Sequence, residues 1–271
     1  MVRTRKRFGQ HFLEPAWVRK VADAIDPKPD DVILEIGPGR GALTRALASS
    51  GAQIHAVEID RDLAHELAAA VPPNVQIVQG NVLDVDWTEI ADRAHTAGRR
   101  MRVVGNLPYN ISSPILMKLV DLHRSTGRVF DAVVMLQREV ADRVAAPPGT
   151  RDYGVLSIIS QLHARVEHLL TLPPGAFRPA PQVSSAVIGL RFGPHRTPAR
   201  DIVLFEQLVR SMFTQRRKTL SNALKSFAGT TDMTAVEALA AAGIDPQRRP
   251  ETLTLDEIAR LANAFGAKGP A

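Results

Sequence analysis

The sequence predicts an α/β fold in which a mostly parallel, doubly wound sheet is followed by a small all-helical domain. Three observations support this prediction. Short β-rich runs alternate with helical stretches along the first half of the chain, and a glycine-rich turn follows the first clear run. A third observation is that the strand-like runs stop after a proline-containing stretch at residues 193–200.

Each element follows from its local pattern. The expected strands are apolar, largely β-branched runs: Val32–Ile36, Ile54–Ile59, Val75–Val78, Met101–Val104 and Phe130–Leu136. The stretches between them suit helices: Arg40–Ser49, Arg61–Ala70, Asp86–Ala94 and Ser112–Asp121. Open sheets of this type bind ligands at the carboxyl ends of their strands, where the strand order reverses. We therefore expect the functional site at that edge.

The stretch Gly193–Arg200 reads as a linker, because it contains two prolines and a glycine. Beyond it, apolar residues recur at helical spacing in Ile202–Met212 and Leu220–Phe227. Thr254–Glu257 has the sequence of a capping box and precedes an apolar helical face. We expect one domain over residues 1–195 and a helical domain over residues 196–271.

Composition limits the function classes. Of 271 residues, 45% are hydrophobic and 23% charged, which excludes a disordered or fibrous chain. The formal net charge of +6 favours a polyanionic partner, and the absence of cysteine excludes disulfides, thiolate metal ligands and cysteine nucleophiles. No signal peptide is visible, and runs such as Ala132–Leu136 are far shorter than the roughly 20 residues that span a bilayer. We expect a soluble, cytoplasmic protein.

A nucleoside-binding pattern surrounds the first strand. Gly37 and Gly39 allow a sharp turn and a close ligand approach. Glu58 follows Gly37 by 21 residues, at the end of the next strand, where a carboxylate can accept from both ribose hydroxyls. Asn81, after the third strand, could accept from an adenine amino group. A nicotinamide enzyme also fits, since Ala42 completes G-x-G-x-x-A, and so does a plain βα turn with Glu58 as a solvated strand end.

The tetrapeptide Asn106-Leu107-Pro108-Tyr109 follows the fourth strand. Pro108 restricts its own backbone and that of Leu107, which leaves the Leu107 carbonyl and the Asn106 side-chain oxygen as neighbouring acceptors. Beside the ring of Tyr109, they suit a planar base with an exocyclic amino group. Acceptors that hold both amino hydrogens favour a lone pair aimed at an electrophile, such as a sulfonium methyl, in a displacement that depends on positioning. An ordinary proline loop with a buried tyrosine is the alternative.

A second aromatic residue, Phe177, begins the proline-rich stretch Phe177–Ser185. Because prolines keep such a segment extended, it could place Phe177 opposite Tyr109 and sandwich a base. Taken alone, Phe177 fits a core position better.

Together these residues resemble a known family, the KsgA/RsmA ribosomal RNA adenine N6-dimethyltransferases. The resemblance extends from about Arg5 to Phe265, and the stretches that carry it are FGQHFL (8–13), EIGPGRGALT (35–44), EID (58–60), NLPYN (106–110), LQREVADR (136–143), FRPAPQVSSAV (177–187), QRRKTL (215–220) and GIDPQRRPETLT (243–254). NLPY with the F-x-P-x-P-x-V-x-S segment is specific to RNA adenine N6-methyltransferases. QRRKTL and the GIDP segment favour the dimethyltransferase branch over the Erm branch.

The resemblance implies a Rossmann-like class I S-adenosylmethionine-dependent methyltransferase domain with a helical C-terminal domain. It implies that S-adenosylmethionine is converted to S-adenosylhomocysteine while two adjacent adenosines near the 3′ end of 16S ribosomal RNA are dimethylated during 30S assembly. The cofactor-lining residues it implies are His11, Leu13, Gly37, Glu58, Asn81 and Asn106, with Gly39 in the same glycine turn. Asn106, Leu107, Tyr109 and Phe177 would hold the target base, on the turn that Pro108 stiffens.

Two positions depart from the usual family pattern. His11 stands where the family commonly has Asn, and Asn81 stands where it commonly has Asp. An asparagine still accepts from the adenine amino group, but without charge, so we expect a somewhat weaker cofactor contact.

Basic residues form two groups that suit RNA phosphates: an N-terminal group of Arg3, Arg5, Lys6, Arg7, Arg19 and Lys20, and a helical-domain group of Arg210, Arg216, Arg217, Lys218 and Lys225. A solvated helix face explains the second group equally well. The eight histidines show no metal-ligand spacing, and we expect His163 and His168 at the surface or at strand ends. We expect a monomer without metal or membrane contact. The alternatives are an Erm-like 23S methyltransferase and a non-catalytic assembly or transcription factor on the same fold.

Overall fold

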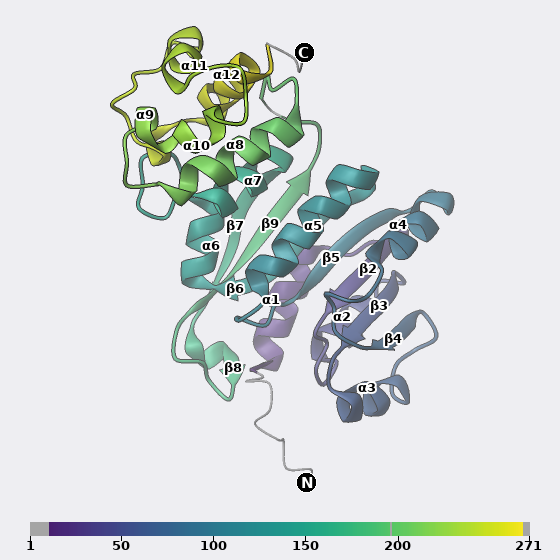
Figure 1. Ribbon diagram of the computed structural model, residues 1–271. Coiled ribbons are helices and arrows are strands. Elements are labelled where there is room, and N and C mark those ends of the chain that lie inside the picture. The colour runs from purple at the N-terminus through teal and green to yellow at the C-terminus, as the bar shows by residue number, and fades with distance from the viewer. Residues whose placement is uncertain (1–10, 196, 268–271) are drawn as a thin grey trace. The chain divides into compact units, whose positions relative to one another are not determined.

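The computed structural model describes residues 11–195 and 197–267, and the chain divides into two compact units (Figure 1). The first unit runs to Ala141 and also includes Ala164–Gly193. The second unit combines Asp142–His163 with the chain from Pro194 onward, so it contains a stretch that the sequence predicts in the first domain. The break between Gly193 and Pro194 lies within the expected linker.

The first unit contains a seven-stranded sheet in the order β4-β3-β2-β5-β6-β9-β7, with β4, β3 and β2 toward the right of Figure 1 and β9 and β7 toward the left. The five expected strands are confirmed as a parallel set, because β2, β3, β4, β5 and β6 pair in parallel. Strand β9 is antiparallel to β6, and β7 is antiparallel to β9. The strand bounds are β2 Asp31–Ile36, β3 Gln53–Glu58, β4 Val75–Gln79, β5 Arg100–Asn106, β6 Val129–Gln137, β7 Ala164–Leu172 and β9 Ser185–Phe192.

Strands β7 and β9 were not predicted from the sequence. Strand β7 exposes three charged or titratable side chains, Arg165, Glu167 and His168, because it forms the edge of the sheet. Strand β9 carries Gly189 and Arg191 and begins within the serine-containing end of the proline-rich segment. Neither stretch therefore shows the continuous apolar run that marks a buried parallel strand.

The helices predicted between the parallel strands are confirmed, and a further helix precedes β2. Asp60 caps α3 by accepting from the backbone N–H groups of Asp62 and Leu63, and Asp86 caps α4 in the same way. The helix bounds are α1 Pro15–Ile25, α2 Ala42–Ala48, α3 Arg61–Ala68, α4 Trp87–Thr96 and α5 Ser112–Thr126. A short two-stranded sheet joins β1 Phe12–Leu13 to β8 Phe177–Arg178.

The strand order reverses between β2 and β5, and this reversal positions the site. The chain proceeds outward from β2 through β3 to β4 on one side, and then from β5 to β6 on the other side. The carboxyl ends of β2 and β5 therefore lie side by side with their following loops directed apart. Such a reversal forms a crevice in open α/β sheets.

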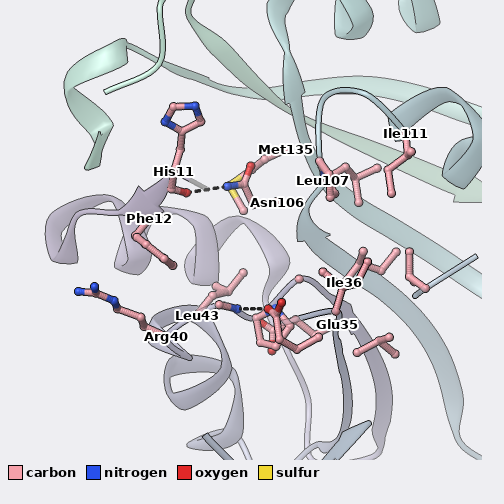
Figure 2. A pocket seen from close by; sticks show the side chains of 18 of the residues that line it. His11, Phe12, Glu35, Ile36, Arg40, Leu43, Asn106, Leu107, Ile111 and Met135 are labelled. Carbon is pink, nitrogen blue, oxygen red and sulfur yellow. Dashed lines mark hydrogen bonds between the residues drawn. The ribbon is translucent and has the colours of Figure 1, made fainter. Parts of the chain in front are cut away.

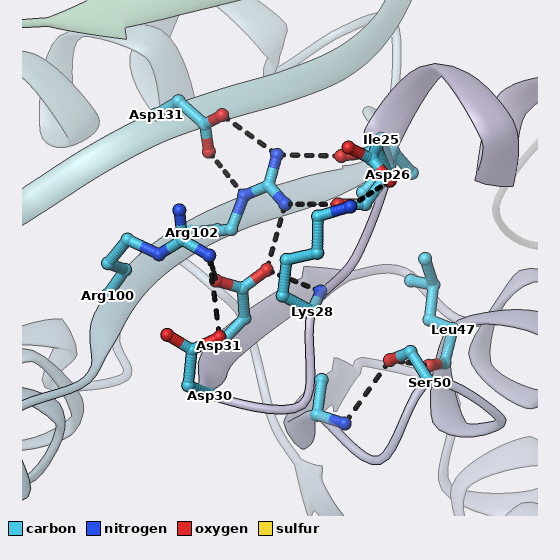
Figure 3. A network of polar contacts seen from close by, with 11 residues as sticks. Ile25, Asp26, Lys28, Asp30, Asp31, Leu47, Ser50, Arg100, Arg102 and Asp131 are labelled. Carbon is cyan, nitrogen blue, oxygen red and sulfur yellow. Dashed lines mark hydrogen bonds and ion pairs between the residues drawn. The ribbon is translucent and has the colours of Figure 1, made fainter.

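The opposite end of the sheet is held by a buried ion-pair network around Arg102 (Figure 3). Its guanidinium donates in a bidentate manner to Asp131, at 2.7 and 2.8 Å, and to Asp31 at 2.9 Å. It also donates to the carbonyls of Ile25 and Asp26, at 2.7 and 3.1 Å. These bonds join β2, β5 and β6 to the end of α1, far from the carboxyl ends of the strands.

The regular elements described in the second unit are helices. Helix α6, Arg138–Ala145, begins in the first unit and ends in the second. The capping box of Thr254 and Glu257 is confirmed at the start of α12, whereas the Leu220–Phe227 stretch forms two short helices. The other bounds are α7 Val155–His163, α8 Ile202–Thr214, α9 Leu220–Ala223, α10 Lys225–Ala228, α11 Ala235–Ala242 and α12 Leu255–Gly266.

The expectation that His163 lies at the surface is wrong, although the residue directly precedes strand β7. Its side chain is buried in this second unit, with Nε2 3.0 Å from Oε1 of Glu206. Its apolar neighbours on α7 bury the whole helix face, which overrides the polarity of one histidine. His168, by contrast, is exposed on β7, as expected.

Two further observations apply to the described residues alone. None of their helices is long and apolar enough to cross a membrane, and no group of three or more histidines or acids is arranged to hold a metal ion. The expected basic arm of Arg3, Arg5, Lys6 and Arg7 lies outside the described residues, as does the start of the motif at residues 8–13.

Candidate active site

A cavity of about 580 Å³ opens in the first unit at the carboxyl ends of the central strands (Figure 2). Its walls come from the loops after β2, β3, β4 and β5 and from the segment around β1. The cavity therefore lies at the reversal of strand order, where the fold predicts a ligand site.

The glycine turn after β2 forms one wall. Gly37 and Gly39 have φ angles of 67° and 55°, which side chains rarely adopt. A Cβ on Gly39 would lie 2.9 Å from the ring of Phe12, so a side chain at this position would displace that ring. Gly37 donates its N–H to the carbonyl of Val57 at 3.0 Å, which ties the turn to β3.

Glu58 ends β3 and faces the glycine turn. Its Oε2 accepts from the N–H of Gly39 and its Oε1 from the N–H of Asp60, both at 2.9 Å. The side chain is buried, and this burial raises its pKa while the two backbone N–H groups oppose the rise. A carboxylate has about four acceptor sites, so each oxygen can still accept one further hydrogen bond from a ligand in the cavity.

Asn81 follows β4 and also lines the cavity. Its Oδ1 accepts from the N–H of Leu83 at 3.1 Å, and its Nδ2 donates to Oδ2 of Asp84 at 3.0 Å. The amide oxygen of Asn81 keeps a second acceptor site. The loop thus fixes which end of the amide can serve as an acceptor.

Asn106 ends β5 at the reversal of strand order. Its Nδ2 donates to the backbone carbonyl of His11 at 3.0 Å, as the dashed line in Figure 2 shows. Its Oδ1 is buried and has no hydrogen-bond partner among the described residues. An unpartnered buried acceptor is costly, so this oxygen indicates a ligand that donates to it.

The turn after Asn106 is rigid. Leu107 is buried, and its N–H donates to the carbonyl of Met135 on β6 at 3.1 Å. The carbonyl of Pro108 accepts from Ile111 at 3.1 Å, which closes the turn ahead of α5. The Tyr109 hydroxyl lies 3.0 Å from Oγ of Ser185 on β9.

His11 lies against Tyr109 in this structure. The two ring centroids are 5.9 Å apart with an angle of 26° between the ring planes. Nδ1 of His11 is 2.7 Å from the carbonyl of Pro179, which orients the imidazole. The segment around β1 thereby contacts the Tyr109 turn on one side and the proline-rich segment on the other.

The cavity contains ten of the eleven site residues predicted from sequence, and Phe177 is not among the residues that line it. Phe177 is buried in β8, opposite Leu13 of β1, within the apolar core of the first unit. The ten lining residues are His11, Leu13, Gly37, Gly39, Glu58, Asn81, Asn106, Leu107, Pro108 and Tyr109.

Two informative residues were not predicted from the sequence: Glu35, which lines the cavity, and Gly105, which directly precedes the lining residue Asn106. Glu35 lines the cavity at 1% exposure, and its burial, with the nearby charge of Glu58, raises its pKa to about 7. Gly105 has a φ of 154°, and a Cβ on it would lie only 2.4 Å from the carbonyl oxygen of Ile36. An acid inside an apolar strand, and a glycine inside another, are the signals that could have identified them.

The fold and cavity together define a Rossmann-like methyltransferase with a helical C-terminal part. Residues 1–266 match the family described as ribosomal RNA adenine dimethylase, and the chain belongs to that family. The predicted activity, adenine dimethylation of ribosomal RNA, is thereby confirmed.

Relatives and solved structures agree with this assignment. The chain is 46% identical to "Ribosomal RNA small subunit methyltransferase A" of Geobacter metallireducens, over 99% of this chain and 98% of the relative. It is 45% identical to the protein of the same name in Pseudomonas syringae pv. tomato, over 98% of this chain and 96% of the relative.

Two solved structures confirm the predicted fold. A dimethyladenosine transferase from Plasmodium falciparum superposes with a TM-score of 0.78 at 23% identity, covering 96% of this chain and 98% of that one. The 23S rRNA methyltransferase ErmE superposes with a TM-score of 0.69 at 25% identity, covering 94% and 99%.

Proposed function

We propose that this chain transfers methyl groups from S-adenosylmethionine to N6 of two adjacent adenosines near the 3′ end of 16S ribosomal RNA, within assembling 30S subunits in the cytoplasm. The observation that carries the proposal is that one cavity joins the Glu58–glycine-turn wall to the Asn106–Tyr109 turn. The near-full-length relatives named for the small subunit support that substrate over 23S ribosomal RNA.

The residues present fit the cofactor. Glu58 has free acceptor sites for the two ribose hydroxyls, and Asn81 offers an uncharged acceptor for the adenine amino group. The backbone of Gly37 and Gly39 allows close approach, and His11 and Leu13 close the cavity from β1. When bound, S-adenosylmethionine supplies an electrophilic methyl group on a sulfonium.

The turn after β5 would hold the target base. Asn106 Oδ1 and the Leu107 carbonyl accept the two hydrogens of the adenine amino group, and Tyr109 stacks on the base. These acceptors favour a nitrogen lone pair directed into the cavity, and they stabilise the positive charge that the nitrogen gains. Because the turn is fixed by bonds to β6 and β9, most of the rate gain comes from positioning.

Phe177 does not line the cavity, so its proposed effect on base binding is indirect. Its burial opposite Leu13 stabilises the β1–β8 pair, which carries His11 and Pro179 at its ends. A direct stack on the base would require Phe177 to leave this core position.

In this proposal the first unit is the catalytic domain, and basic residues of the helical unit contact the RNA. Arg217 and Lys218 are exposed in the second unit, whereas Arg216 is bonded to Glu251 at 3.1 Å and to the carbonyl of Arg151. Arg216 therefore orders the loop that presents its two basic neighbours, which suit phosphate oxygens.

Methyl transfer onto undermethylated subunits tests the proposal. Purified protein is incubated with labelled S-adenosylmethionine and with 30S and 50S particles from cells that lack this protein. We expect label as N6-dimethyladenosine at two adjacent positions near the 3′ end of 16S RNA. Label confined to 23S RNA, or no transfer although the cofactor is bound, would contradict the proposal.

A further inference from the structure

A half-buried lysine organises the loop that contains Asn81. Lys118, on α5, points its ammonium at three backbone carbonyls of the segment after β4, those of Val82, Leu83 and Val85. The Nζ–O distances are 3.3, 2.6 and 2.7 Å. An ammonium has three donors, so the three carbonyls satisfy it completely.

The ammonium also lies near an aromatic ring. Nζ lies 5.0 Å from the ring centroid of Trp87, which is buried and donates Nε1–H to the Val82 carbonyl at 3.0 Å. Burial lowers the pKa of Lys118, while the charges of Asp84 and Asp86 oppose the fall. The three carbonyl dipoles and the two carboxylates favour the charged form of Lys118.

Without a cation, these carbonyls would repel one another. Three carbonyl oxygens that converge on one point form a negative concavity, and only a positive charge or a donor cluster stabilises it. The same segment contains the bonds that hold Asn81, since Asp84 N–H donates to the Asn81 carbonyl at 2.9 Å and Leu83 N–H donates to its side chain. A change in the loop backbone therefore changes the direction of the Asn81 amide.

Lys118 also connects the two halves of the cavity wall. Helix α5 begins at Ser112, directly after the turn that carries Tyr109, and both Tyr109 and Ile111 line the cavity. Asn81 and Val82 line it from the other side. One side chain thus links the helix behind the proposed base-binding turn to the loop behind the proposed adenine-binding residue.

We propose that Lys118 is a positioning residue that sets Asn81 to recognise the amino group of the cofactor's adenine ring. This inference rests on the proposed function. The ammonium touches neither cofactor nor base, and it acts through the backbone of residues 82–85. Its removal weakens cofactor binding at one chemical group, the adenine amino group, and leaves the ribose contact of Glu58 in place.

Calorimetry with two ligands tests this role. Lys118→Met keeps the length of the side chain and removes the charge, and Lys118→Arg keeps the donors. The ligands are S-adenosylhomocysteine and its deaminated analogue, in which oxygen replaces the adenine amino group. For Lys118→Met we expect Kd to rise about tenfold for S-adenosylhomocysteine and less than about twofold for the analogue. Lys118→Arg should recover part of the loss, and Lys28→Met, at the opposite end of the sheet, should change neither Kd.

Two readouts separate this role from general destabilisation. Hydrogen exchange of the Leu83–Val85 amides should quicken in Lys118→Met while amides of β2 and β5 stay protected. In an Asn81→Ala background, Lys118→Met should cause no further loss of affinity, because both changes act on one contact.

The outcomes are distinct. Equal losses for the two ligands, additive losses with Asn81→Ala, or unchanged exchange in the loop would each overturn the role of Lys118. If the wild-type protein binds neither ligand, the proposed function itself fails. Normal wild-type binding with an unaffected Lys118→Met variant overturns the role of Lys118 alone.

Discussion

Asn106 donates a hydrogen bond to the backbone carbonyl of His11, 3.0 Å away, although 95 residues separate the two in sequence. This bond determines the orientation of the amide, because the nitrogen must face His11. The oxygen is consequently directed into buried space without a partner among the described residues. The N-terminal segment thereby prepares the acceptor that the proposed reaction needs.

Tyr109 should contribute mainly through its ring. Tyr109→Phe removes only the contact with Ser185, so we expect methyl transfer to fall a few-fold at most. Tyr109→Ala removes the stacking surface, which is worth roughly 1–3 kcal/mol, and should slow transfer by about 10- to 100-fold. Rates at saturating cofactor on 30S particles measure both. Equal losses in the two variants would show that the hydroxyl, and not the ring, matters.

Glu58 should control cofactor affinity. In Glu58→Gln one oxygen becomes an amide nitrogen that faces the N–H of Gly39 or Asp60, so the turn must move. Each lost charge-assisted hydrogen bond is worth roughly 1.5–3 kcal/mol, so we expect Kd for S-adenosylhomocysteine to rise at least about tenfold. Calorimetry measures this, and an unchanged Kd would remove Glu58 from the proposed cofactor site.

Glu35 should make stability depend on pH. Its pKa is about 7 in the folded protein, against an ordinary value of 4.5. Between these values the unfolded chain releases the proton and the folded chain keeps it, so stability falls as pH rises from about 4.5 to 7. Below this window the cost is absent, and above it the cost is complete at about 3 kcal/mol.

Glu35→Gln removes this titration. The free energy of unfolding, measured with denaturant at pH 4.5 and pH 8, should favour the variant increasingly at the higher pH. The same pH dependence in both proteins would mean that Glu35 is ionised in the folded state.

Gly105→Ala should disrupt the pairing of β2 and β5 beside the cavity. The new Cβ would lie 2.4 Å from the carbonyl oxygen of Ile36, so β2 and β5 must separate beside Asn106. Steric overpacking of this kind costs about 1–3 kcal/mol, and we expect a lower Tm together with a loss of methyl transfer. Gly98→Ala is the matched control. Alanine is strained at the positive φ of this position, but no atom lies within 4 Å of the added Cβ. This variant should lower Tm and leave transfer intact, whereas equal losses of transfer would argue against a local effect.

Local patterns were sufficient to predict the parallel core and most of the cavity. Strand β2 is buried throughout and apolar at every position but Asp31 and Glu35, so both its existence and its ligand-binding end could be predicted. Strand β7 could not be predicted in this way. Because it lies at the edge of the sheet, residues such as Glu167 are exposed and interrupt the apolar pattern.

Long-range packing explains the remaining differences. The burial of Phe177 depends on pairing between β8 and β1, which no local pattern in either segment indicates. His163 and Glu206, which form a pair, are likewise 43 positions apart in sequence. Lys118 is more than 30 positions from the residues that it contacts in the loop after β4. Such contacts are set by the fold and not by neighbouring residues.

The most direct test of the central claim is single-turnover methyl transfer by Asn106→Ala on undermethylated 30S particles, with cofactor at saturating concentration. The lost bond to His11 costs only about 1 kcal/mol of stability, so the variant should remain folded. If Asn106 Oδ1 holds the adenine amino group, transfer should slow by about 10²- to 10³-fold. Transfer within a few-fold of the wild-type rate would contradict the assignment of the Asn106–Tyr109 turn as the site that holds the base.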